Sequence, residues 1–381
     1  MRSHFKDNSS GSLTVPWRSR TFFSFSISLF ALWFTATAAH PSSELKAPFQ
    51  ADLHRGAFGT LSSRFNCLTP SQPVRDLLFG GFYADRGEGS SVLDASAKQA
   101  YDEAVRPIAR FERSISHLSD LYFGSSPPKE IIARCVLEWL IAWARSDAML
   151  GKVSEQGGYV RKWALATVAM SYLKVRGEQA LEGEKKAAVE RWISRWTRIV
   201  REDYSTGLRR ESRRNNHLYW AAWSVSAAAA VLNDHQSFQW GLDRYRFALE
   251  QIQEDGTLPL ELKRTSKALH YHIFSIAPLI LIAETGTRNG IPLYDGRGGA
   301  LHRLARRSIE ALDDPIFFQR ATGHVQDWVG ELSGDKLAWM EPYYARHPQG
   351  NLKKWIRRFR PLKNPRLGGD LTLLYGAPMG E

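Results

Sequence analysis

Segments with the periodicity of helices follow one another from Ala95 almost to the end of this chain. In the first segment, apolar residues recur at three- and four-residue steps, as an amphipathic helix requires, at Ala104, Ile108, Phe111, Ile115 and Leu118. Further segments of helical length follow at residues 131–151, 159–177, 185–203, 215–233, 234–252, 272–290 and 297–312. Glycines or polar turns end several of them, and strand-like alternation with hairpin turns is scarce. The pattern predicts an all-α fold of paired helices.

The same stretch contains no linker that would divide it into two domains. A chain of 381 residues is long enough to bury a large core in one domain. Pro278 lies inside the segment 272–290 and is expected to kink or interrupt that helix. We therefore expect residues 39–381 to form a single helical domain.

The first 40 residues have the composition of an export signal. Four basic residues precede an uncharged, apolar stretch at residues 21–40, which ends in the small-residue pattern from Ala36 to Ala38. This order is typical of a secretory signal peptide. A retained transmembrane anchor is the competing interpretation, but the apolar part is short and is interrupted by Ser and Thr. We predict that residues 1–38 are a signal peptide, and that the mature chain lies in the periplasm with no stable membrane anchor.

The net charge narrows the class of partner. A formal charge of +12 favours a polyanion, which could be nucleic acid, anionic lipid or an acidic polysaccharide, although a basic surface kept for solubility is the alternative. Export argues against nucleic acid. The chain also carries 13 Trp, 13 Tyr and 19 Phe, whose flat rings suit sugar platforms as well as cores. We expect an acidic polymer outside the cytoplasm as the partner, and no nucleic acid.

Cysteine usage agrees with export. Cys67 and Cys135 are the two cysteines of the chain, and an even pair in an exported protein suggests one disulfide. Two buried free thiols remain the alternative, because sequence does not show that the pair is close enough to bridge. Neither cysteine has a His/Cys cluster at zinc-site spacing nearby, so we expect no metal.

Polar groups gather in the stretch 215–271, which opens with NNHLYWAAW and closes with LPLELKRTSKALHY. Arg264 and Tyr271 are seven residues apart, so both would share one helix face if a helix began as early as Arg264. A neighbouring cation lowers the pKa of a tyrosine and helps it to transfer protons. Asn216 and His217, adjacent at the expected start of a helix, can point into the same cleft.

These groups fit β-elimination from a uronic acid polymer. Arg, amide and imidazole donors can neutralise the sugar carboxylate, which makes the neighbouring C5 proton easier to remove. A base then takes that proton and an acid protonates the leaving C4 oxygen, with no metal or organic cofactor. From these residues alone, helix caps and surface pairs remain an open alternative.

The two motifs add a resemblance to a family. NNHLYWAAWS followed by LPLELKRTSKALHYH resembles the alginate lyase family of the AlgL type, the periplasmic poly-mannuronate lyases. The likeness extends more weakly to RPIARFERSISHLSDLY, CVLEWLIAWARSDAML and LAWMEPYYAR, and so covers most of the chain after about Phe65. It implies an α/α toroid, an incomplete barrel of paired antiparallel helices with a deep central cleft.

The resemblance also implies roles for particular residues. Its catalytic groups match Asn216, His217, Arg264 and Tyr271, with the tyrosine as proton-transfer residue and the other three at the carboxylate. Whether Tyr271 or His217 takes the C5 proton stays open. The family pairs two cysteines near the positions of Cys67 and Cys135, and it uses no cofactor.

The chain departs from the family in the glycine-rich segment 79–94, a candidate lid. The family carries Lys-Tyr-Glu-Gly-Ser there, whereas this chain has Arg86 at the lysine and Gly87 at the tyrosine. Arg86 can still bind a carboxylate, and Tyr83 is the candidate to replace the missing ring. The other predicted substrate-binding residues are Asn215, Trp220, Lys263 and Arg346. Further candidates for the cleft wall are Trp163, Tyr219, Arg213 and Arg214.

Our leading hypothesis is therefore a monomeric polysaccharide lyase that cleaves mannuronate-rich alginate. One alternative is a non-catalytic protein that binds or helps to export an acidic polysaccharide, and another is a lyase for a different polyuronate. A glycoside hydrolase on a similar toroid would need paired carboxylates in the cleft. The candidates for that pair are Glu138, Asp147, Glu261 and Glu341.

Overall fold

The structure is a computed structural model that describes residues 44–50, 65–84, 89, 91–124, 128–207, 209–328 and 331–376. By its contacts the chain divides into Met1–Ser43 and Glu44–Glu381, and the description below concerns the second unit. The expected signal peptide, residues 1–38, lies outside the described residues. Arg86 and Gly87 of the candidate lid lie outside them as well.

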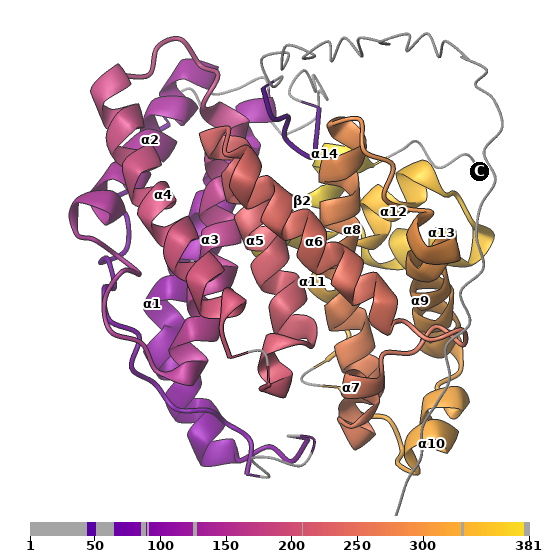
Figure 1. The fold of residues 1–381 in the computed structure, drawn as a ribbon. Coiled ribbons are helices and arrows are strands. Elements are labelled where there is room, and N and C mark those ends of the chain that lie inside the picture. Colours follow the sequence, from indigo (N-terminus) through magenta and orange to yellow (C-terminus); the bar gives the residue numbers. More distant parts are fainter. Residues whose placement is uncertain are drawn as a thin grey trace, which may run out of the picture. The chain divides into compact units, whose positions relative to one another are not determined.

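Helices make up nearly all of the regular structure of Glu44–Glu381 (Figure 1). The longer helices are α1 (Ala95–Asp120), α2 (Lys129–Arg145), α3 (Glu155–Val175), α4 (Gly183–Ser205), α5 (Asn216–Leu232), α6 (His235–Gln251), α8 (Ala268–Arg288) and α9 (Gly296–Asp313). The shorter α-helices are α7 (Pro259–Leu262), α10 (Ile316–Thr322), α11 (Gly334–Leu337), α12 (Met340–Arg346), α13 (Gly350–Phe359) and α14 (Leu371–Tyr375). The 3-10 turns are η1 (Leu121–Phe123), η2 (Glu211–Arg213), η3 (Thr265–Lys267) and η4 (Pro365–Leu367). Two short antiparallel strands, β1 (Lys363–Asn364) and β2 (Gly369–Asp370), pair with Lys363 opposite Asp370.

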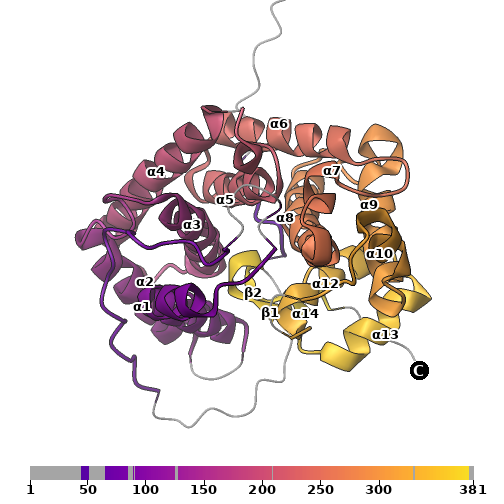
Figure 2. The same cartoon turned by 90° about the horizontal axis from the view of Figure 1, so that it is seen from below.

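The long helices form two layers around a central space (Figure 2). In the inner layer α1 packs against α3, α3 against α5, and α5 against α8. Each inner helix also packs against the helix that follows it, giving the pairs α1–α2, α3–α4, α5–α6 and α8–α9. The predicted all-α fold, an incomplete α/α toroid of paired helices, is confirmed.

Helix α5 shows how local sequence and burial specify this arrangement. The side chain of Asn215 caps its first turn by accepting a hydrogen bond of 3.1 Å from the backbone N–H of His217. Asn233 ends it in the left-handed conformation, with φ at 51°. The four consecutive alanines at residues 227–230 are fully buried, and their small size lets α3, α6 and α8 approach closely. The NNH motif at residues 215–217 thus lies at the capped start of a buried helix.

Helix α8 runs through Pro278 without ending, so of the two expected effects of this proline the interruption is wrong, and the kink stays a prediction. A proline removes one backbone hydrogen bond. Here it lies in a helix whose residues from Ile276 to Gly286 are all buried against neighbouring helices, and that packing keeps the helix whole. Within the described residues, α8 with its preceding turn is also the one helix long and apolar enough to cross a membrane, yet 83% of that stretch is buried inside the protein. It is a core helix of the toroid.

Two sets of contacts fix the ends of the chain to this frame. Cys67 and Cys135 form a disulfide, as predicted, with their Cα atoms 5.6 Å apart, and so tie the residues before α1 to helix α2. Near the other end, Arg360 pairs with buried Glu341 and Arg366 pairs with buried Glu112. These basic residues of the tail therefore turn inward to carboxylates of the core.

Candidate active site

A cleft of about 900 Å³ opens on the inner side of the toroid. It is lined by the segment 79–83 with Gly89, by α1 and α3, by the start of α5, and by the stretch from α7 to α8. The predicted site residues that line it are Tyr83, Asn215, His217, Lys263, Arg264 and Tyr271, together with Trp163 from the cleft-wall candidates. Residues 215–217 and 263–271, far apart in sequence, are thus brought to one wall.

Tyr271 is the centre of a compact group. Its hydroxyl lies 2.6 Å from the hydroxyl of Tyr83, and either can be the donor. The guanidinium carbon of Arg264 lies 3.6 Å from the centre of the Tyr271 ring and 5.3 Å from that of Tyr83. Burial raises the pKa of Tyr271 above its ordinary value, and the Arg264 charge and the hydrogen bond from Tyr83 offset only part of that rise. An ionisable phenol therefore lies next to a guanidinium group.

The backbone brings Arg264 and Tyr271 together in a way that the seven-residue spacing did not predict. Helix α8 begins at Ala268, so Arg264 is not on it, and the shared helix face is wrong. Arg264 instead precedes the turn η3, where Thr265 has a positive φ of 48°. This turn folds the guanidinium back over the tyrosine ring.

His217 is held as a neutral imidazole. Its ring stacks on Tyr159 with centroids 3.6 Å apart and an angle of 11°, and its Nδ1 lies 3.3 Å from the Nζ of Lys162. Burial lowers the pKa of His217 well below its ordinary value, and the charges of Lys162, Arg264 and Arg213 lower it further. The ring can therefore donate or accept one hydrogen bond at neutral pH, but it does not carry charge.

Asn216 faces away from the cleft. It is 0% exposed, and both its backbone N–H and its side-chain Nδ2 donate to the same carboxylate oxygen of Glu261, at 2.8 and 2.9 Å. Glu261 is fully buried, and burial raises its pKa while Arg264 and the bonds from Asn216 lower it. This buried pair joins the start of α5 to the α7–η3 turn, and so fixes His217 relative to Arg264.

The other predicted residues divide into two groups. Asn215 caps α5 beneath His217, and Lys263 pairs with Glu211 at the exposed rim of the cleft. Trp220 and Arg346 are not brought to this cluster. Trp220 is 1% exposed and donates its indole N–H to the carbonyl of Phe274, while Arg346 makes a two-point ion pair with buried Glu284.

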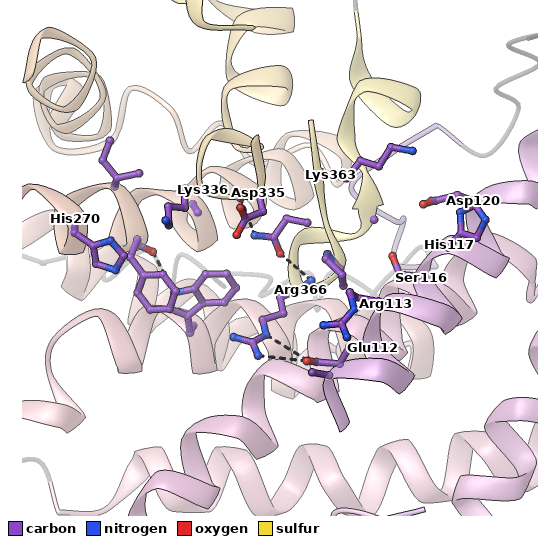
Figure 3. A pocket seen from close by; sticks show the side chains of 18 residues that line it. Glu112, Arg113, Ser116, His117, Asp120, His270, Asp335, Lys336, Lys363 and Arg366 are labelled. Atoms are coloured by element: carbon purple, nitrogen blue, oxygen red, sulfur yellow. Dashed lines mark hydrogen bonds and ion pairs between the residues drawn. The ribbon is translucent and has the colours of Figure 1, made fainter. Parts of the chain in front are cut away.

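A second cavity of about 610 Å³ adjoins the cleft (Figure 3). The two share His270, Phe274 and Arg366 as lining residues. Arg366 reaches this boundary from the C-terminal tail, is held by both oxygens of Glu112 at 3.3 Å, and lies 4.5 Å from the Trp163 ring. The other ionisable residues that line the second cavity, besides His270, are Arg113, His117, Asp120, Asp335, Lys336 and Lys363. Arg366 thus lies at the boundary of two cavities whose linings contain both acidic and basic side chains.

Sequence reasoning missed three residues of this site. Tyr159, Lys162 and Arg366 lie far from the central motif in sequence, and only packing brings them to His217 and Trp163. The carboxylates considered for a hydrolase do not line either cavity. They pair with bases or with Asn216 elsewhere, as Glu138–Lys185, Asp147–Arg195, Glu261–Asn216 and Glu341–Arg360.

Comparison with known proteins identifies the family. The family model described as alginate lyase matches residues 85–318. The chain belongs to the alginate lyase family. It is 36% identical to a polysaccharide lyase of Stenotrophomonas maltophilia over 80% of this chain and 88% of that protein. It is 33% identical to an alginate lyase of Pseudomonas syringae over 89% and 91%.

A solved structure of the family has the same fold. Alginate lyase A1-III of a Sphingomonas species, solved as a Tyr-to-Phe variant in complex with a tetrasaccharide, superposes with a TM-score of 0.77 at 26% identity. The match covers 90% of this chain and all of that one. The toroid fold is therefore that of this lyase family.

Proposed function

We propose that this protein is a polysaccharide lyase that cleaves alginate by β-elimination. The observation that carries the proposal is the group around Tyr271. Its buried phenol is hydrogen-bonded to the hydroxyl of Tyr83 and lies under the Arg264 guanidinium, and neutral His217 lines the same cleft. Family membership and the bound tetrasaccharide of the A1-III structure support it. An acidic polysaccharide is accordingly the proposed substrate.

The reaction needs one proton to leave C5 and one to reach the C4 oxygen. Arg264 and His217 bind the uronate carboxylate and stabilise the negative charge that develops on it. The Tyr271 phenolate takes the C5 proton, the electron pair forms the C4–C5 double bond, and the C4–O bond breaks. The phenol then donates its proton to the departing oxygen. Glu261 and Asn216 act from behind, by joining the start of α5, which carries His217, to the α7–η3 turn, which carries Arg264.

Three finer statements belong to the same proposal. The preference for mannuronate rests on the likeness of the two central motifs to poly-mannuronate lyases. The periplasmic location rests on the signal-like composition of residues 1–38. A monomer is proposed because one chain supplies every group of the cleft described above.

A substrate panel tests the activity. Purified mature protein is incubated with poly-mannuronate, poly-guluronate, acetylated alginate and a non-alginate polyuronate, with the Tyr271→Phe variant as control. We expect a rise in ultraviolet absorbance from the new double bond, fastest with poly-mannuronate and absent in the variant. Salt-sensitive binding without any absorbance would replace the lyase with a binding protein. Reducing ends released without absorbance would indicate a hydrolase.

A further inference from the structure

Lys162 is a buried cation without a carboxylate partner among the described residues. It lies in the middle of α3 and is 0% exposed. Its Nζ is 4.4 Å from the ring centre of Tyr159, 4.6 Å from that of Trp163 and 5.4 Å from that of Tyr204. The one side-chain atom at hydrogen-bond distance is Nδ1 of His217, at 3.3 Å. The lysine is therefore directed at the imidazole.

Lys174, on the same helix, is buried in a different way from Lys162. Lys174 is also buried, but it pairs with buried Asp120 and donates to Ser119. Burying a charge is costly unless it is paired and hydrogen-bonded. The Nζ of Lys162 instead lies over three aromatic rings, whose faces favour a cation, and has one hydrogen-bond acceptor, Nδ1 of His217. Removing that acceptor would leave the ammonium with no conventional partner.

The chemistry of the two groups decides where the imidazole proton lies. An ammonium has three N–H donors and no acceptor, and a neutral imidazole has one N–H and one accepting nitrogen. Burial lowers the pKa of Lys162 well below its ordinary value, whereas the three ring faces around its Nζ favour the ammonium form, which has no lone pair and can only donate. Nδ1 of His217 is then the acceptor, and the hydrogen lies on Nε2. The flat stack on Tyr159 prevents the ring from turning to exchange the two nitrogens.

We propose that Lys162 is a positioning residue that holds His217 in the Nε2–H tautomer. His217 lines the cleft, and with Nδ1 engaged it presents Nε2–H there as a hydrogen-bond donor. In this form it can bind a carboxylate but cannot take the C5 proton, so proton abstraction is left to Tyr271. That the group bound by Nε2–H is a uronate carboxylate rests on the proposed function. The tautomer itself does not.

Nitrogen NMR on the free protein tests the tautomer without any substrate. The chain is labelled with 15N-histidine, and the signals of His217 are assigned by their loss in a His217→Gln variant. We expect Nδ1 at the shift of an unprotonated ring nitrogen and Nε2 at that of a protonated one. The reverse assignment in the unmodified protein would overturn the proposal. Because no turnover is measured, a chain inactive on alginate would leave this result standing.

A variant links the tautomer to catalysis. Lys162→Met keeps the apolar stem but removes every donor, so both tautomers should be populated. Loss of a hydrogen bond from a charged donor predicts that kcat falls by about tenfold or more. The matched control is Tyr204→Phe, which keeps the ring beside Lys162 and should leave the His217 signals unchanged. A Lys162→Met protein that retains the Nε2–H signals and a kcat within about twofold would refute the assignment.

Discussion

Replacing each hydroxyl of the Tyr83–Tyr271 pair separates a proton-transfer role from a supporting one. The two oxygens are 2.6 Å apart, so each substitution by Phe removes the same hydrogen bond and nearly the same volume. If Tyr271 transfers the proton, Tyr271→Phe should lower kcat by about 10²- to 10⁴-fold. Tyr83→Phe costs one neutral hydrogen bond, about 0.5–1.5 kcal/mol, which corresponds to about a two- to tenfold loss.

The pH dependence gives the pair a second signature. The hydrogen bond from Tyr83 lowers the pKa of Tyr271, so its removal raises that pKa. A base acts in its deprotonated form, which is populated above its pKa. The rising limb of kcat/KM should therefore move to higher pH in Tyr83→Phe. A shift to lower pH, or none, would show that Tyr271 is not the base.

The assay is the initial rate of ultraviolet absorbance on poly-mannuronate, measured from about pH 5 to 11, because the ordinary tyrosine pKa is about 10 and burial raises that of Tyr271. Thermal unfolding of both variants supplies the control for folding. Equal losses in the two variants would mean that the hydrogen bond, and not the Tyr271 proton, limits the rate. Tyr271→Phe with at least a tenth of the original kcat would exclude the tyrosine from the chemical step.

Three further outcomes follow from the same structure. Glu261→Ala leaves two buried donors of Asn216 without an acceptor, and should lower the free energy of unfolding by about 2–5 kcal/mol in chemical denaturation. Glu261→Gln keeps an amide oxygen as acceptor and should lose less than half of that stability. Equal losses in the two variants would contradict this role of Glu261. Cys67→Ser opens a loop closed over a separation of 68 residues and should cost at most about 4 kcal/mol, with kcat unchanged because neither cysteine lines the cleft. A lowered kcat in folded Cys67→Ser protein would refute that separation. Raising the salt from about 0.05 to 0.5 M should increase KM several-fold, because the charges that attract the polyanion are screened, and a salt-independent KM would contradict electrostatic binding.

Helical periodicity was sufficient to predict the fold class, because each long segment repeats its apolar residues over several turns. The boundaries of α5 and α6 follow from caps that are visible in the sequence, such as Asn215 and Asp234. Pro278 misled because a local rule was applied to a helix that is buried on nearly all sides. Packing energy from the surrounding helices is not visible in a local window, and here it outweighs one missing hydrogen bond.

The site was predictable only where motifs carried it. The motifs placed His217, Arg264 and Tyr271 on one cleft wall, yet the geometric reason given for the last two was wrong, since the turn at Thr265 replaces the expected helix. Lys162 could not be identified, because its partner His217 is 55 residues away and its own surroundings read as an ordinary buried helix. Contacts of this kind depend on how α3 and α5 pack, which no spacing in the sequence encodes.

Tyr83 is part of the candidate lid and also contacts the hydroxyl of Tyr271. It belongs to the stem of the candidate lid, where it bridges to Leu93 and where Ala84 N–H donates to the carbonyl of Val92 at 2.9 Å. Gly89, with φ at 86°, lies so close to the carbonyl oxygen of Lys263 that any larger residue would collide with that backbone. The segment that borders the cleft is thus also the segment that supplies the hydrogen bond to the Tyr271 hydroxyl. Displacing this stem would remove the Tyr83 bond and raise the pKa of Tyr271 further, so in the proposed mechanism the stem helps Tyr271 to lose its proton.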